Sequence, residues 1–307
     1  MRSNIFITGV TGCVGHYIFD LLVSNPDYQL FLLVRDPKRL KRDLSKYSNV
    51  KIIQDDLSNI KNHAEVLKQM DYVIHSAAGW GNTETNYDYS LDLFNALDHG
   101  RVKKLIYLST ASILDSNNKP NPEVDKIGTG YIVSKYRMFK ELPKLAAYDK
   151  IITLFPTWVL GGDDTHPYSH AMEGILGAIK WLWLLRFFTF DLSFHFIHAH
   201  DIALIVNHLL KNEVKDKELV LGNPLISADQ LIKEICAYFN KKIYWQIKIT
   251  QGFVKTMLNI FGKKISEWDK YCLEKVKFEH DVVSAKTFGL KTEKDTISGV
   301  LKNLMEI

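Results

Sequence analysis

A tyrosine and a lysine, Tyr131 and Lys135, have the spacing of a proton-transfer pair. Side chains four residues apart lie on one face of a helix, and the sequence predicts a helix from 131 to about 147. An ammonium group near a phenol stabilises the phenolate and lowers the pKa of the tyrosine, which can then act as a general acid or base. The sequence context strengthens the prediction of a proton-transfer pair, because the two residues follow a hydroxyl-rich strand end at 109–112 and, further upstream, a glycine turn.

That glycine turn, Gly9-x-x-Gly12-x-x-Gly15, predicts a binding site for the phosphates of a dinucleotide, because it joins a buried strand at 5–7 to an apolar helix. Gly9 allows a sharp turn, Gly12 lets the backbone approach a pyrophosphate, and Gly15 lets the helix pack close to the strand. The helix N-terminus presents free N–H groups and a positive dipole end to phosphate. We expect these residues of the turn to contact the cofactor: Gly9, Thr11, Gly12, Cys13, Val14 and Gly15.

The end of the second predicted strand, 29–34, carries the residues that distinguish NAD from NADP. In a dinucleotide-binding sheet this strand end meets the adenosine ribose. The carboxylate of Asp36 would accept hydrogen bonds from the ribose hydroxyls of NAD, whereas the guanidinium of Arg35 would pair with the 2′-phosphate of NADP. Arg35 comes first and further basic residues follow it, so we favour NADP and keep NAD as the alternative.

The next strands would complete the cofactor side of the site. They are predicted at 50–57, 71–79 and 104–108. Asp56 and Leu57 would lie beside the adenine. Ala77 and Ala78 end the fourth strand in small residues, which lets its backbone pass close to the cofactor.

Strands that alternate with helices predict an α/β protein built on a Rossmann-type, doubly wound parallel sheet. The Rossmann domain would span 1–160 and include a helix at 86–98. Residues 161–307 would form mainly a smaller, discontinuous substrate-binding region, from which about 195–222 returns to the sheet. Later elements are predicted as a helix at 229–239, a strand at 242–246 and an apolar helix at 253–265.

Composition argues against several classes of partner and location. The 307 residues are 46% hydrophobic and 24% charged, as in soluble globular proteins. The net charge of +4 is mild and dispersed, which argues against nucleic-acid binding. The chain enters a predicted strand within five residues, which leaves no room for a signal peptide, so we expect a cytoplasmic protein.

The cysteines and histidines predict no metal site. Cys13, Cys236 and Cys272 lack the spacing of metal ligands and fit a reducing compartment. The histidines of the second half lie in different local contexts, without a pair four apart on a clear helix. They are His166, His170, His195, His198 and His200.

Taken together, the motifs resemble those of the extended short-chain dehydrogenases/reductases of the NAD-dependent epimerase/dehydratase family. The resemblance covers nearly the whole chain and is carried by the segments 8–15, 55–57, 73–78, Asn86, 108–112, 131–135, 155–161, 196–203, 284–290 and 296–300. It implies a Rossmann fold, a nicotinamide cofactor and a small-molecule substrate. Homodimerisation is a further expectation of the family.

The resemblance also implies roles for individual residues. Tyr131 would be the catalytic acid/base, and Lys135 would lower its pKa and bind the nicotinamide ribose. Thr110 would hold the substrate oxygen; we favour it over Ser109 because the apolar residues at 113–114 align with a hydrophobic pair of the family. Pro156 and Thr157 would lie against the nicotinamide.

The sequence departs from the family pattern in the cleft. The segment between Ala78 and Asn86 is shorter than usual, which shortens one wall of the substrate site. Phe155 stands where the family usually has arginine. The shorter segment argues against a large nucleotide-sugar ligand.

We therefore predict hydride transfer between NADP(H), or NAD(H), and a secondary alcohol or ketone on a fairly apolar substrate, as in the dihydroflavonol reductase and 3β-hydroxysteroid dehydrogenase branches. One alternative is a nucleotide-sugar epimerase or dehydratase that retains its NAD. Another is an NAD(P)-binding sensor or assembly factor without turnover.

The apolar run at 175–190 allows three interpretations. It could pack in the core or between two copies of the chain. It could form an apolar pocket or lid for substrate, or it could contact a membrane surface. Lys180 and Arg186 interrupt the run, which is shorter than the roughly 20 residues of a spanning helix.

Overall fold

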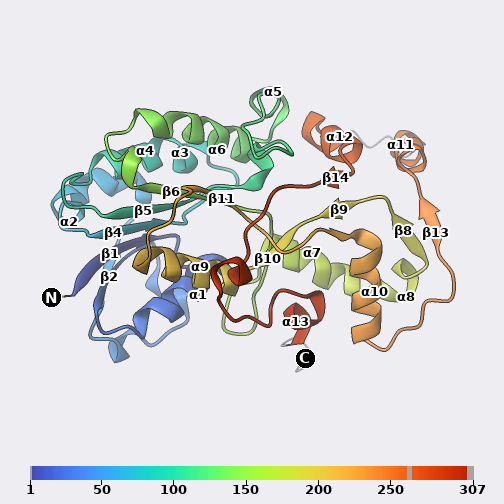
Figure 1. Ribbon diagram of the computed structural model, residues 1–307, viewed down its shortest axis with the longest axis horizontal. Helices are drawn as coiled ribbons and strands as arrows, with labels where there is room; N and C mark the ends of the chain where they lie inside the picture. Colours follow the sequence, from blue (N-terminus) through green and yellow to red (C-terminus); the bar gives the residue numbers. More distant parts are fainter. Residues whose placement is uncertain (1, 261–264, 303–307) are drawn as a thin grey trace.

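A seven-stranded parallel sheet organises the computed structural model, which describes residues 2–260 and 265–302 (Figure 1). In spatial order its strands are β11 (Glu218–Leu221), β6 (Ile151–Pro156), β5 (Lys104–Leu108), β4 (Tyr72–His75), β1 (Ser3–Thr8), β2 (Tyr28–Val34) and β3 (Val50–Gln54). The middle of β1 is apolar and fully buried, as expected for a central parallel strand that is covered on both faces. The predicted Rossmann-type α/β sheet is confirmed.

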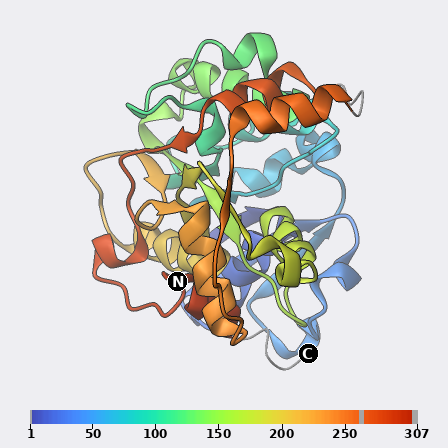
Figure 2. The same ribbon diagram turned by 90° about the vertical axis from the view of Figure 1, so that its right-hand side faces the viewer.

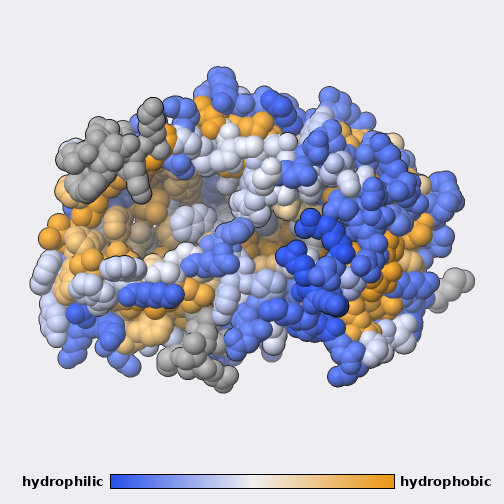
Figure 3. Space-filling view, turned by 180° about the vertical axis from the view of Figure 1, so that it is seen from behind, coloured by the Kyte–Doolittle hydropathy of each residue, from blue (hydrophilic) through white to orange (hydrophobic). Residues whose placement is uncertain are grey.

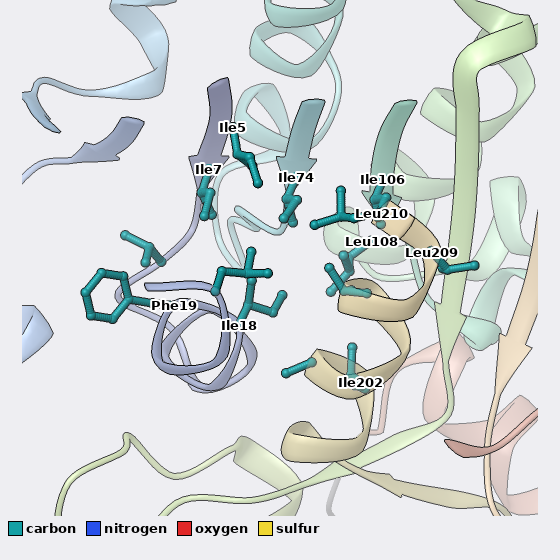
Figure 4. Packing of buried hydrophobic residues seen from close by; sticks show 14 of the residues in the cluster. Ile5, Ile7, Ile18, Phe19, Ile74, Ile106, Leu108, Ile202, Leu209 and Leu210 are labelled. Atoms are coloured by element: carbon teal, nitrogen blue, oxygen red, sulfur yellow. The ribbon is translucent and has the colours of Figure 1, made fainter. Parts of the chain in front are cut away.

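Helices cover the two faces of this sheet (Figure 1). One face carries α1 (Cys13–Val23) and α9 (Ala199–Lys211). The opposite face carries α3 (Thr83–Asn86), α4 (Asp88–Asn95) and α6 (Gly130–Glu141), with α2 (Ala64–Leu67) and α5 (Val124–Ile127) nearby. Figure 4 shows the core under the first face, where Ile18 of α1 and Ile202 of α9 lie against Ile5, Ile74 and Ile106 of the strands.

Two predicted helices differ from the observed ones. The helix predicted at 86–98 is divided into α3 and α4 at Tyr87, and α4 ends at Asn95. The helix predicted from 131 to about 147 ends at Glu141 and continues as a 3₁₀ turn at Leu142–Lys144. Pro143 lacks the N–H that a further helical hydrogen bond needs, which explains the early end.

After β6 the chain leaves the sheet and forms most of a second region, which Figure 2 shows end-on. Its helices are α7 (His170–Ile179), α8 (Leu182–Leu185), α10 (Ala228–Tyr238), α11 (Gln251–Ile260), α12 (Glu267–Glu274) and α13 (Ile297–Leu301). Its short strands are β7 (Trp158–Leu160), β8 (Phe188–Phe190), β9 (Ser193–Phe194), β10 (Phe196–His198), β12 (Ile226–Ser227), β13 (Ile247–Ile249) and β14 (Lys277–Phe278). Between these strands the chain returns to the main sheet as α9 and β11.

The late elements were predicted less accurately. The strand expected at 242–246 is irregular, and β13 begins immediately after it, paired with β8. The helix expected at 253–265 corresponds to α11, and residues 261–264 lie outside the described residues.

The apolar run at 175–190 is divided among several environments. Ile175 and Leu182 are buried in the core of the second region, whereas Trp181 and Trp183 are each 59% exposed. Phe190, at the end of the run, lines a cavity. None of the described helices is long and apolar enough to cross a membrane.

Candidate active site

Two glycines of the turn after β1 are required by packing within the protein. Gly9 has a left-handed backbone (φ +74°), and a Cβ on it would lie 2.4 Å from the backbone nitrogen of Ala77 at the end of β4. A Cβ on Gly15 would lie 2.2 Å from the carbonyl oxygen of Gly9. Both contacts are shorter than van der Waals packing allows. They explain how the turn, α1 and the end of β4 approach so closely.

Gly12 differs from these two because it faces outward at the start of α1. It is exposed, and a Cβ there would come no nearer than 3.3 Å to another described residue. Among the described residues, no side chain caps the N-terminus of α1, and its first turn has no acidic residue. A bare helix N-terminus with glycine in front fits a pyrophosphate, so the turn matches the predicted dinucleotide.

Three other predicted contacts of the turn lie at the same helix start. Thr11, Cys13 and Val14 are each partly buried there. Burial, assisted by the carboxylate of Asp163, raises the pKa of the Cys13 thiol to about 12. The thiol is therefore neutral at physiological pH and acts as a packing group rather than a nucleophile.

The structure brings Arg35 close to Asp56, with 3.6 Å between Nε and a carboxylate oxygen. Asp36 and Asp56 each accept a hydrogen bond from a backbone N–H two residues ahead, and so cap the 3₁₀ helices at Pro37–Leu40 and Leu57–His63. Leu57 is buried in the core. The guanidinium of Arg35 is thus exposed at this strand end, while one oxygen of Asp36 accepts a hydrogen bond from the backbone.

Lys135 is a buried lysine at the carboxyl end of β5. Its Nζ donates a hydrogen bond of 2.9 Å to the carbonyl oxygen of Leu108 and lies 4.7 Å from the ring centre of Tyr107. Burial lowers the pKa of Lys135 to about 7. Burial therefore disfavours the charged form of this side chain.

Tyr131 begins α6 one turn before Lys135. Burial raises the pKa of Tyr131 to about 12, the direction opposite to the predicted lowering by Lys135. The Tyr131 ring is stacked on the indole of Trp80 at 4.3 Å between ring centres, and the edge of His170 contacts the same indole at 4.7 Å. Lowering of the Tyr131 pKa by Lys135 stays a prediction, and Trp80 is a partner of Tyr131 that the motifs did not indicate.

Asn86 explains how the short segment after β4 is held near Tyr131. Its amide oxygen accepts from the N–H of Gly79, and its amide nitrogen donates to the carbonyl of Gly79 and to the hydroxyl of Ser134 in α6. Asn86 thus connects the loop that carries Trp80 to the helix that carries Tyr131. The sequence motif included Asn86, but only the contacts reveal this role.

Thr110 lies at the carboxyl end of β5, where its hydroxyl accepts from the backbone N–H of Ser112. Thr110 is partly buried, whereas Ser109 is buried. Thr110 is therefore the better exposed of the two candidate hydroxyls, and its catalytic role stays a prediction.

A cavity of about 720 Å³ is lined by Ala111 and Ser112, the two residues that follow Thr110 in the chain, whereas Thr110, Tyr131 and Lys135 are not among its lining residues. Thr157, which lies between β6 and β7, lines the cavity and donates a hydrogen bond to the carbonyl oxygen of Leu221. Pro156 is buried at the end of β6. Most of the lining is aromatic or aliphatic and comes from the second region. Its rings belong to Trp158, Phe190, Phe194, Trp268, Tyr271 and Phe278, together with His195 and His280.

His75 and His166 are engaged in hydrogen bonds within the protein. Both ring nitrogens of His75 contact hydroxyls, at 2.7 Å to Thr8 and 2.8 Å to Ser90, so His75 is a satisfied core residue. His166 is bonded to Asp20 of α1 on one side and to Asp163 on the other. Within residues 2–260 and 265–302, no group of histidines, cysteines and acids has the arrangement of a metal site.

Proteins with related sequences and folds include enzymes of several kinds. The 3 beta-hydroxysteroid dehydrogenase/Delta 5→4-isomerase of monkeypox virus is 28% identical over 153 residues, 46% of this chain and 43% of the viral protein. This chain therefore matches less than half the length of that relative.

Two solved structures share the fold at low sequence identity. WbmG of Bordetella bronchiseptica, solved with NAD and UDP, has a TM-score of 0.70 at 17% identity, over 100% of this chain and 95% of its own. Vestitone reductase from alfalfa (Medicago sativa) has a TM-score of 0.66 at 18% identity, over 99% of each chain. At such identities these similarities describe the fold alone.

The NAD dependent epimerase/dehydratase family matches residues 5–222 of this chain. The match extends from β1 through the glycine turn and α6 to the return of the chain at β11, so it includes the entire parallel sheet except the first residues of β1. The resemblance seen in the motifs is thereby confirmed. The protein is a member of the NAD-dependent epimerase/dehydratase family, with the fold of the extended short-chain dehydrogenases/reductases.

Proposed function

We propose that the protein is an NADP(H)-dependent oxidoreductase that interconverts a secondary alcohol and a ketone on a fairly apolar substrate. The observation that carries this proposal is the mainly apolar cavity lined by Thr157 and by Ala111 and Ser112, the residues that follow Thr110 in the chain. A substrate that fills it would bury hydrocarbon against rings, which favours binding by about 25 cal/mol per Å² of apolar surface removed from water.

The same cavity argues against a nucleotide sugar. A diphosphate needs cationic or N–H partners. Among the described lining residues, Lys275 is the single lysine and there is no arginine. Burial also lowers the pKa of Lys275. The short wall between Ala78 and Asn86 supports the same conclusion.

Each site residue has a separate part in the proposed reaction. The bound nicotinamide supplies or accepts the hydride. The Oη atom of Tyr131 gives a proton to the substrate oxygen during reduction and removes it during oxidation. Thr110 donates a hydrogen bond to that oxygen, and protonated Lys135 favours the phenolate of Tyr131.

A pair of variants on α6 tests this assignment. Tyr131→Phe removes the proton donor, so we expect turnover of a reducible ketone to fall at least about 100-fold while NADPH binding is unchanged. Tyr136→Phe, on the same helix but packed in the core, serves as the control. Full turnover by Tyr131→Phe would contradict the proposed role.

The choice of NADP rests on Arg35, whose side chain is exposed, while Asp36 is engaged as a cap. Titration with NADPH and NADH, followed by nicotinamide fluorescence, tests it. We expect Arg35→Ala to weaken NADPH binding at least about tenfold and to leave NADH binding nearly unchanged, since a charge-assisted pair to phosphate is lost. Tighter binding of NADH by the wild type would favour NAD and the self-recycling epimerases.

A further inference from the structure

Exposed aromatic side chains are concentrated at one end of the second region. Of the ten large hydrophobic side chains that are exposed among the described residues, seven lie between 181 and 253. We call them the aromatic face: Trp181, Trp183, Leu184, Tyr244, Trp245, Ile247 and Phe253. Figure 3 shows hydrophobic residues gathered at this end of the molecule, around a hollow. A patch of this kind on a soluble fold marks an interaction surface.

The aromatic face is continuous although it comes from two distant parts of the chain. Strand β8 pairs with β13, and the N–H of Ile247 donates to the carbonyl oxygen of Phe187. The Phe187 ring stacks on Trp245 at 4.7 Å, and Arg186 donates to the carbonyl oxygen of Lys242. These contacts join the α8 segment to the 242–249 segment as one surface.

The charge around this face is almost entirely positive. The run 175–190 contains two basic residues and no acid, and 235–266 contains no acid. The exposed lysines are Lys180, Lys241, Lys242 and Lys248. Asp191, an acid that directly follows the 175–190 run, is paired with Lys248 at 3.1 Å.

Lysines that alternate with aromatic rings are characteristic of one kind of partner. The buried centres of protein interfaces are depleted of lysine, because its ammonium would lose water without a partner. At a lipid interface, tryptophan and tyrosine lie at the level of the headgroups, and lysine side chains extend to the phosphates. We propose that the aromatic face docks on the surface of an anionic membrane.

The cavity supports this orientation, because its wall and the aromatic face share elements. Phe190 of β8, Ile249 of β13 and Val254 of α11 all line the cavity. Docking would therefore bring the apolar cavity beside the lipid. Membrane binding itself needs no turnover, so it can be tested independently of the proposed reaction.

Flotation of the full chain with two kinds of vesicle tests the proposal. One kind contains phosphatidylcholine alone, and the other contains equal parts of phosphatidylcholine and phosphatidylglycerol. We expect the protein to bind the anionic vesicles, to bind the neutral ones at least about tenfold more weakly, and to be released by high salt. Absence of binding to anionic vesicles, or equal binding to both kinds, would overturn the proposal.

Surface variants with matched controls locate the contact. Lys241→Glu with Lys242→Glu should weaken binding at least about 25-fold, since each lysine near an anionic surface contributes roughly fivefold. Trp181→Ser with Trp183→Ser should weaken it as strongly. Lys211→Glu with Lys215→Glu, near the end of α9, and Tyr148→Ser replace exposed residues elsewhere and should bind like the wild type.

Two further measurements keep the outcomes distinct. NADPH binding by each variant should equal that of the wild type, which shows that the fold is intact whether or not the proposed reaction is correct. Sedimentation velocity without vesicles detects self-association. If the tryptophan variants convert a dimer to a monomer and the wild type ignores vesicles, the face is an interface between copies and the membrane proposal is wrong.

Discussion

The sheet region and the second region differ in how many large hydrophobic side chains they leave exposed, since seven of the ten exposed ones among the described residues lie between 181 and 253. Phe6, Phe19 and Phe94 in the sheet region are fully buried, whereas Trp181 and Trp183 in the second region are mostly exposed. The sheet has helices on both faces, so its apolar residues have partners within the chain. The comparison indicates that the sheet region supplies stability and cofactor geometry, and that the second region supplies surfaces for other molecules.

Replacing one aromatic residue in each region tests this division most strongly. Phe6→Ala leaves a cavity in the core and should lower the free energy of unfolding by about 4 kcal/mol. Trp183→Ala removes an exposed ring and should change it by less than about 0.5 kcal/mol. Urea unfolding followed by circular dichroism measures both. Equal losses in the free energy of unfolding would show that Trp183 stabilises the fold although it is exposed.

Glycines provide a second contrast between the regions. Gly15→Ala would force a Cβ against the carbonyl oxygen of Gly9 and should cost about 3 kcal/mol of stability. Gly177, in α7, has nothing within 4 Å of a built Cβ, so Gly177→Ala should stabilise by about 1 kcal/mol through helix propensity. Thermal unfolding measures whether Gly15→Ala lowers and Gly177→Ala raises the stability of the protein. A destabilised Gly177→Ala would mean that α7 packs more closely than the contacts indicate.

Lys135 is a buried amine in the sheet region, and the proposed function gives it a part in the reaction. Replacing the buried amine with an apolar side chain, Lys135→Met, should raise the free energy of unfolding at pH 7 by about 2 kcal/mol and abolish turnover. The exposed Lys140 on the same helix is the control, and Lys140→Met should change neither quantity.

The pH dependence of this effect has a definite sign. The pKa of Lys135 falls from its ordinary value of 10.5 in the unfolded chain to about 7 in the folded one. The unfolded state therefore binds more protons between these pH values, and this residue's contribution to stability improves as the pH rises from about 7 to 10.5. Lys135→Met should remove that slope. An unchanged slope would show that the lysine is charged and paired when folded.

His166 joins the two regions and should give the smallest effect. Burial alone would lower its pKa, but hydrogen bonds to Asp20 and Asp163 outweigh burial and raise it. A raised pKa adds stability that is complete below about pH 6.5 and is lost as the pH rises through the higher folded value. We expect His166→Gln to cost about 1 kcal/mol at pH 6 and less at pH 9. A larger loss of stability at pH 9 than at pH 6 would show that folding lowers the pKa of His166 rather than raising it.

Local sequence was sufficient to predict the sheet region. Buried strands such as β1 are continuous apolar runs. The turn after β1 needs glycine at fixed positions within a few residues, so it can be recognised from a short stretch of sequence. The positions of Tyr131 and Lys135 follow from helical spacing alone. For this reason the family, the sheet and the start of the site could be inferred without coordinates.

Long-range contacts explain what the sequence did not reveal. Strand β13 forms where the chain meets β8, about sixty residues earlier, so apolar pattern alone placed it a few residues too early. The stacking of Trp80 on Tyr131 depends on a loop that Asn86 holds from another element. The environment of Tyr131 also depends on burial, which raises its pKa, whereas spacing predicts only the influence of Lys135.

The late return of the chain to the sheet has a consequence for biosynthesis. Helix α9 covers one face of the sheet, and β11 completes its edge, yet both are translated after the excursion that begins at β7. While a ribosome adds those residues, the apolar side chains of β1, β4 and β5 that α9 later covers lack that cover. Nascent chains shorter than about residue 211 should therefore be substrates for chaperones that bind exposed strands.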